Sequence, residues 1–300
     1  MHFIDFTGKC LPSEFARRTR PLDVLKYWKA TEFRVFLLYV GPLALKGLLD
    51  QDHYEHFLLL HRAVALLAEP SLTPENAECA RQCIRRFIQQ YTPLYFPYPI
   101  TFNLHALSHL PSDALRYGGL DKISCFPFEN FLKSLKGLVR GARAPLAQVV
   151  RRMAELNKLP SYRMVDDRSP ITPSEVHRDG PLPQGYPNGV KQYGKIILET
   201  EKGEITIKSK EPDNCVQLEE NICKVVNIIE YEKSIHFVVR IYQPHGDFYT
   251  EPFQSSLVGE IICVDTNDPL KCFPLSSLIK KIVLLSYEET LLAIPMRHLS

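Results

Sequence analysis

The sequence lacks any long hydrophobic run and any secretory leader. No stretch of about 18 uncharged apolar residues occurs among its 300 residues, so hydropathy predicts no membrane-spanning helix and no membrane partner. The first residues, Met1–Asp5, have neither a basic flank nor an apolar core, and we expect no signal peptide.

A disulfide framework is also missing. The eight cysteines are scattered, and several fall within apolar runs such as Ile261–Val264. This usage is typical of reduced, buried thiols, so we expect an intracellular protein, nuclear or cytoplasmic. The cysteines are Cys10, Cys79, Cys83, Cys125, Cys215, Cys223, Cys263 and Cys272.

The chain has no large excess of charge and no glycine-rich phosphate loop. Lysine and arginine number 36 against 34 aspartate and glutamate, which gives a net charge of +2. Any surface for nucleic acid must therefore be local. The Gly118–Gly119 pair is not followed by Gly-Lys-Ser/Thr, so it predicts a turn and no nucleotide site.

Residues 1–158 have helical periodicity. Thr73, Pro74 and Glu75 form a helix start signal, with a cap, a proline and an acid in the first turn. The span 52–68 is apolar on nearly all sides, which predicts a helix buried in a larger body. Tyr91–Pro99 holds three prolines and is expected to be a connector. Further helices are predicted at about 101–110, 112–117, 127–140 and 144–157.

The second half of the chain differs in composition and period. Residues 159–190 are rich in proline and polar side chains and are predicted to form a linker. From residue 191 to 300 apolar and polar residues alternate, which predicts a small all-β barrel or sandwich. The predicted fold class is therefore α+β, with an all-α domain (1–158), a linker and a β domain.

Two pairs of side chains suggest a zinc site. His105 and His109 are four residues apart, as are Cys79 and Cys83 on the preceding predicted helix. On a helix this spacing places both side chains on one face, and both residue types bind zinc. The alternative is a pair of hydrogen-bonded histidines and two core thiols.

A lone acid begins a helical region whose other charges are almost all basic. Glu129 follows Pro127, and an acid in the first turn is stabilised by the helix dipole, which is a structural explanation for it. Charge of one sign also indicates a partner that carries phosphates, so we expect these residues to contact DNA. They are Lys133, Lys136, Arg140, Arg143, Arg151 and Arg152.

Three segments together resemble a known family. Leu104–Leu110, the Gly118–Leu120 turn and Phe126–Lys136 resemble the C-terminal part of CACTA/EnSpm-type DDE transposases, and Leu25–Pro42 is similar to the animal branch. The resemblance implies an RNase H-like catalytic domain, in which two aspartates and one glutamate hold divalent metal ions for DNA strand transfer. Glu129 maps onto that glutamate, and His105 with His109 onto half of a zinc site.

The resemblance does not extend to the two aspartates of the family. The family's aspartates precede every matching segment, so we expect this chain to lack them and to bind Mg²⁺ only if another chain supplies them. We expect a transposase-derived remnant, inactive alone, that binds DNA, transposase or other protein partners. Exposed apolar surface near 52–68 would then favour self-association.

Two alternatives remain open from the sequence. The β domain would be a protein-interaction module, similar to a chromatin reader, if its aromatic residues line a groove. Those residues are Tyr231, Phe237, Tyr242, Phe248, Tyr249 and Phe253. Otherwise the chain is the C-terminal piece of an active DDE transposase that performs metal-dependent strand transfer.

Overall fold

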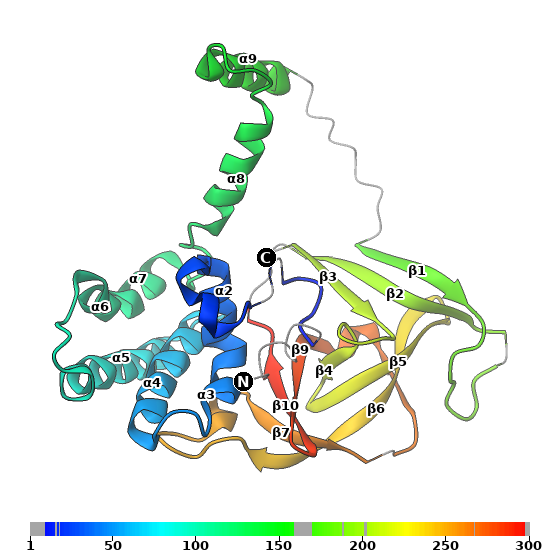
Figure 1. Ribbon diagram of the computed structural model, residues 1–300. Coiled ribbons are helices and arrows are strands. Elements are labelled where there is room, and N and C mark those ends of the chain that lie inside the picture. Colours follow the sequence, from blue (N-terminus) through cyan, green and yellow to red (C-terminus); the bar gives the residue numbers. More distant parts are fainter. Residues whose placement is uncertain are drawn as a thin grey trace.

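The protein combines helices and antiparallel sheet, as a computed structural model shows (Figure 1). The structure describes residues 10–158, 170–200 and 203–297, apart from positions 16, 18, 188 and 267. The N-terminal part is helical and the C-terminal region is rich in sheet, which confirms the mixed helix-and-sheet class predicted from periodicity.

The helical part extends to residue 158. Its helices and short 3₁₀ or π turns are η1 (Leu22–Tyr27), α2 (Ala30–Val35), η2 (Phe36–Val40), α3 (Gly41–Leu45), α4 (Gln51–Leu67), α5 (Pro74–Tyr95), α6 (Phe102–Ala106), η3 (Leu107–His109), α7 (Leu110–Tyr117), α8 (Phe126–Gly137) and α9 (Pro145–Lys158).

The start of α5 confirms the capping signal, whereas its end lies beyond the prediction. The Thr73 side chain accepts a hydrogen bond from the Asn76 amide at 3.2 Å. The helix then continues to Tyr95 with Pro93 inside it, through a span predicted as connector. The Tyr95 ring packs against His56 of α4, with ring centroids 5.2 Å apart. Tertiary packing of this aromatic end thus extends the helix past its proline.

The C-terminal region forms one sheet in which every pairing is antiparallel. Its strands are β1 (Ile171–His177), β2 (Lys191–Thr200), β3 (Gly203–Lys208), β4 (Cys215–Leu218), β5 (Asn221–Tyr231), β6 (Ser234–Asp247), β7 (Ile261–Asp265), β8 (Lys271–Pro274), β9 (Leu278–Tyr287) and β10 (Thr290–Pro295). The order is β1-β2-β5-β4-β9-β10-β7-β6-β8, β3 pairs with β2, and β6 also pairs with β5.

One strand lies inside the predicted linker. β1 pairs with β2, for example Ile171 opposite Leu198, although it contains Pro173. β1 is the end of the pairing order, and an edge strand tolerates proline because one side of its backbone needs no ladder partner. The proline content that suggested a linker is thus also compatible with an edge.

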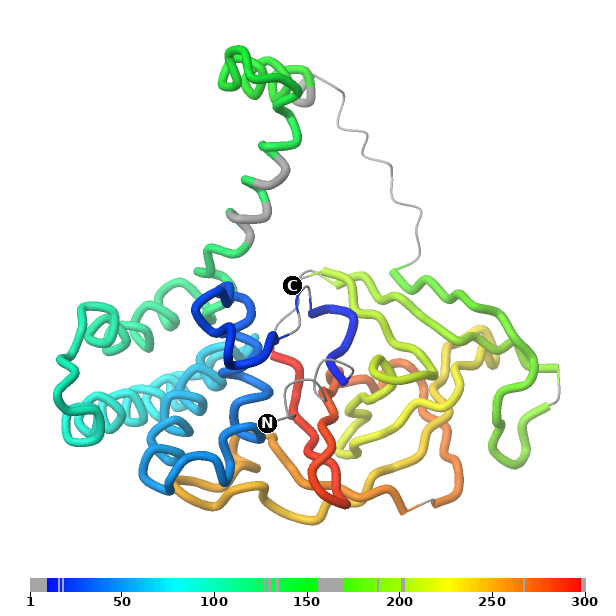
Figure 2. Tube along the Cα trace, viewed as in Figure 1, coloured from blue at the N-terminus to red at the C-terminus, as the bar shows by residue number. Residues whose placement is uncertain are grey.

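The helices and the sheet share a hydrophobic core. One cluster contains Leu58 and Leu67 of α4 together with Val283 of β9 and Leu292 of β10. A second cluster, which includes Ile196 and Phe237, lies within the sheet alone. The two parts therefore meet across a packed seam, which Figure 2 places between the blue helices and the red strands.

The expected exposure of residues 52–68 is wrong. Leu58, Ala63 and Leu67 are fully buried, because α4 packs along α5 and lies in the core that the helices share with the sheet. Large apolar side chains are instead exposed on the 96–102 loop and on α8, namely Phe96, Tyr98, Phe102, Phe128 and Phe131. Among the described helices, none combines the length and the apolar character needed to cross a bilayer.

Candidate nucleic-acid interface

Helices α8 and α9 form an arm that extends away from the helices and the sheet (Figure 1). We call residues 126–158 the arm. None of its described side chains is buried, so packing against the body does not account for its residues. The arm presents most of its described surface to solvent.

The described charges of the arm are mainly basic. Lys136, Arg140 and Arg143 are exposed, and none of the three has an acidic partner among the described residues. Arg152 is half-buried, and Arg151 forms an ion pair with Glu155 across one helical turn, with Nε and Oε1 3.0 Å apart. The structure thus brings five of the six predicted DNA-contacting residues onto one projecting element. The Lys133 side chain lies outside the described part.

One glutamine fixes the turn between the two helices. The Gln148 Oε1 atom accepts a hydrogen bond from the Arg140 amide at 2.9 Å. Its Nε2 atom donates to the carbonyl oxygens of Gly141, at 2.9 Å, and Arg143, at 2.7 Å. These bonds hold the backbone that carries two arginines while leaving their guanidinium groups exposed.

The base of the arm is attached through Arg34 of α2. Its guanidinium pairs with Asp121 and lies over the Phe126 ring, 5.4 Å from the ring centroid. Charge and cation–π attraction therefore link the first residue of α8 to the helical body.

Glu129 lies in the first turn of α8, after Pro127. Its side chain lies outside the described part of the structure. No group of three or more histidine, cysteine, aspartate or glutamate side chains converges on a metal-sized site among the described residues.

The two pairs predicted as zinc ligands remain separate pairs. His105 and His109 are exposed neighbours, with ring centroids 5.4 Å apart. Cys83 is buried in the shared core, and Cys79 packs beside it. Burial raises the pKa of the Cys83 thiol to about 11, which favours the neutral form over the thiolate that binds zinc. The four side chains do not form one metal-binding group.

Most of the aromatic residues of the sheet pack inside the protein. Five of the six are buried, and only Tyr231 is partly exposed. Phe248 and Tyr249 belong to the core shared with the helices, and Phe237 belongs to the core of the sheet. Phe248 and Tyr249 also line a pocket of about 350 Å³ beside Lys46, and the protein-interaction module stays a prediction.

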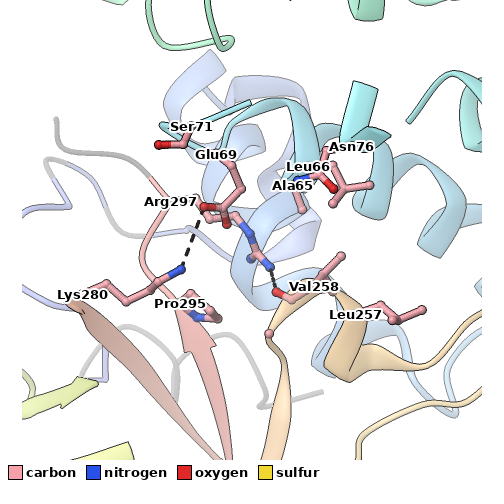
Figure 3. A pocket seen from close by; sticks show the side chains of 11 residues that line it. Ala65, Leu66, Glu69, Ser71, Asn76, Leu257, Val258, Lys280, Pro295 and Arg297 are labelled. Atoms are coloured by element: carbon pink, nitrogen blue, oxygen red, sulfur yellow. Dashed lines mark hydrogen bonds and ion pairs between the residues drawn. The ribbon is translucent and has the colours of Figure 1, made fainter. Parts of the chain in front are cut away.

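A pocket of about 250 Å³ lies on the seam between α4 and the end of β10 (Figure 3). The Arg297 guanidinium donates to the Val258 carbonyl on its inner side. Lys280 and Glu69 also line it, with Nζ and Oε2 3.9 Å apart. One carboxylate beside two cations supplies neither a nucleophile with its base nor a metal-binding set.

Two buried ionic groups were not foreseen from the sequence. His61 and Glu260 pair across the seam at 2.7 Å, and Lys281 binds Glu14 and Asp213 inside the sheet. Lys281 carried a signal, since it is a charge in a strand that is otherwise mainly apolar. Its partner Glu14 is 267 positions away, which no local pattern specifies.

Comparison with known families gives one partial match. Residues 176–296 match the family described as "Domain of unknown function (DUF8592)", which covers less than half of the chain. The matched stretch runs from the end of β1 through β10 and leaves out all helices of the N-terminal part. Comparisons with curated proteins and with solved structures gave no match.

Proposed function

We propose that the protein binds DNA through the arm, as a transposase-derived protein that does not catalyse strand transfer by itself. The observation that carries this proposal is the exposure of Lys136 on α8 and of Arg140 and Arg143 in the turn after it, without acidic partners among the described residues. Clustered cations of one sign attract the phosphate backbone and release its counterions.

The geometry of the arm favours a nucleic acid over a small anion. No described pocket encloses the basic side chains, and they are spread along two helices and the turn between them. A polyanion with regularly spaced phosphates can contact several of them at once, whereas a single phosphate can contact one or two.

The resemblance to CACTA-type transposases supports the same proposal. Phe126–Lys136, which carries that resemblance, forms α8 with Glu129 in its first turn. In this proposal the helical part derives from an RNase H-like catalytic region, and the returning β5–β6 pairing closes a small barrel in the sheet. Strand transfer needs two aspartates beside such a glutamate, and no metal-sized group of these side chains lies among the described residues, so we expect binding without cleavage.

A salt titration of DNA binding tests the proposal. We expect the full chain to bind a labelled duplex with an affinity that falls steeply with salt. Replacing Lys136, Arg140 and Arg143 together by alanine should weaken binding at low salt and reduce the slope of log K against log salt by about 3, one unit per lost phosphate contact. Fluorescence anisotropy measures both.

A charge-matched variant provides the control. Lys191, Lys233 and Lys271 are exposed cations of the sheet, and replacing all three by alanine removes the same charge away from the arm. This variant should bind like the wild type. Equal losses in both triple variants, or no binding at low salt, would show that the arm is not a DNA site.

A further inference from the structure

Residues 10–15, near the N-terminus, lie against strands from the C-terminal part of the sequence. We call this segment the strap; Figure 2 shows it as the dark-blue trace beside the strands. Leu11 and Phe15 are buried, and the Phe15 ring meets the Tyr39 ring edge-on with centroids 5.0 Å apart. The strap therefore touches both the sheet and the helical core.

The carboxylate of Glu14 is bound by two groups of the sheet. Lys281 Nζ lies 2.9 Å from Oε1 and 2.7 Å from Oε2, and the Thr206 amide donates to Oε1 at 2.8 Å. Among the described strands β3 pairs with β2 alone, so its other edge is free to present this amide to the strap. The side chain of Lys281 is fully buried.

Ser13, the preceding residue, is recognised through its backbone as well as its side chain. Its amide and its hydroxyl both donate to Asp213 Oδ1, at 2.8 and 3.0 Å. Burial would raise the pKa of Asp213, but hydrogen bonds from Lys281, Ser13 and Lys208 lower it to about 2. Asp213 is thus an ionised acceptor for this backbone position.

The sheet does not balance its own charge at this site. Lys208 and Lys281 both pair with Asp213, at 2.9 and 2.7 Å, which leaves two ammonium groups and one carboxylate. Glu14 supplies the second carboxylate. Because Lys281 is fully buried and shares Asp213 with Lys208, a site without Glu14 would leave a net positive charge and would favour any segment that brings a carboxylate to the same place.

The site and its occupant belong to different parts of the chain. Thr206, Lys208, Asp213 and Lys281 all lie within the matched stretch 176–296, whereas the strap lies outside it. The strap is not a strand of the sheet; side-chain contacts and the amides of Ser13 and Thr206 hold it there. A short motif with a few strong contacts is the form in which peptide-binding domains recognise their ligands.

We propose that the sheet carries a binding site for acidic peptides with the pattern serine, glutamate, aromatic residue, and that the strap is its resident occupant. The buried lysine and the Thr206 amide bind the glutamate, Asp213 binds the serine, and the aromatic residue enters the seam beside Tyr39. A partner peptide of this chemistry replaces the strap and thereby removes Phe15 from the helical core.

Peptide binding to a chain with a displaced strap tests the proposal. A fluorescent peptide of residues 8–17 is titrated into the full chain with Glu14→Lys, whose new ammonium group repels Lys281 and vacates the site. We expect the peptide to bind this variant at least about tenfold more tightly than the wild type, whose strap competes. A peptide with Glu14→Gln should bind the variant at least about tenfold more weakly, since it lacks the charged acceptor.

The control and a second measurement keep the test decisive. Glu220→Lys makes the same charge change at an exposed position away from the strap, and it should bind the peptide no better than the wild type. If Glu14→Lys does not fold, a peptide with a photoreactive group in place of the Phe15 ring is added in excess to the wild type. Cross-linking to Tyr39 or β3 that requires the peptide's glutamate supports the proposal. Equal binding by all chains and peptides, or no glutamate-dependent cross-link, overturns it.

Discussion

The ion pair between Arg20 and Glu32 shows that a carboxylate with a shifted pKa can stabilise the fold without belonging to an active site. The guanidinium binds both carboxylate oxygens, with Nε–Oε1 2.7 Å and Nη2–Oε2 2.8 Å, and the Lys29 amide donates to Oε2 at 2.8 Å. The hydrogen bond from Arg20 is the largest cause that lowers the pKa of Glu32, from 4.5 to about 2. Glu32 therefore stabilises the start of α2, because its partners are the Arg20 side chain and the Lys29 backbone.

This pair predicts a pH-dependent stability difference. The folded pKa lies below the unfolded one, so the contribution of Glu32 is present above pH 4.5 and is lost as the pH falls towards 2. Glu32→Gln should therefore lower the urea midpoint at neutral pH, and the difference from the wild type should shrink across that window. Glu204→Gln, at an exposed position, should show no such convergence. A difference that stays constant down to the acid end would contradict the assignment.

At the scale of elements, local sequence signals predicted most helices but few of the contacts that those helices and the strands make. The Thr73 cap and the amphipathic pattern of α8 and α9 are local signals, and both helices lie close to the predicted ranges. β1 was missed because Pro173 marks an edge strand as readily as a linker. The basic residues of the candidate site followed from local charge, whereas Glu14 and Lys281 could not be paired without the fold.

The turn of the arm gives a prediction for one element. Gln148→Ala removes the three hydrogen bonds that hold residues 140–143, while the charge of the arm is unchanged. Amide hydrogen exchange at Arg140 should accelerate by about tenfold, with little change in global stability because the arm is not packed against the body. DNA binding should weaken severalfold, since two arginines lose their fixed spacing. Gln89→Ala, on the exposed side of α5, should change neither quantity. If hydrogen exchange at Arg140 is unchanged, the Gln148 hydrogen bonds do not hold the turn.

At the scale of the whole molecule, the seam joins the two parts that the sequence predicts as separate domains. Glu260 is fully buried, and it binds His61 of α4 at 2.7 Å and Tyr249 at 3.0 Å. Burial alone would raise the pKa of Glu260, but the neighbouring His61 and Arg297 lower it below its ordinary value. A buried carboxylate in this position is stable only while helix and sheet remain together, because separation leaves it without these partners.

Cooperative unfolding of helices and sheet follows from this seam. Phe248 lies in the shared core and packs edge-on against Tyr287, with ring centroids 4.8 Å apart. Phe248→Ala should lower the free energy of unfolding by about 3–5 kcal/mol, because it leaves a cavity.

Trp28, the only tryptophan of the chain, is buried in the helical part and reports on that part alone. If the seam unites the parts, Trp28 fluorescence and the circular dichroism of the sheet shift to the same lower urea midpoint. Ile279→Ala, at an exposed position of β9, should shift neither signal. A Trp28 transition that stays at the wild-type midpoint while the sheet unfolds earlier would mean that the two parts are independent domains.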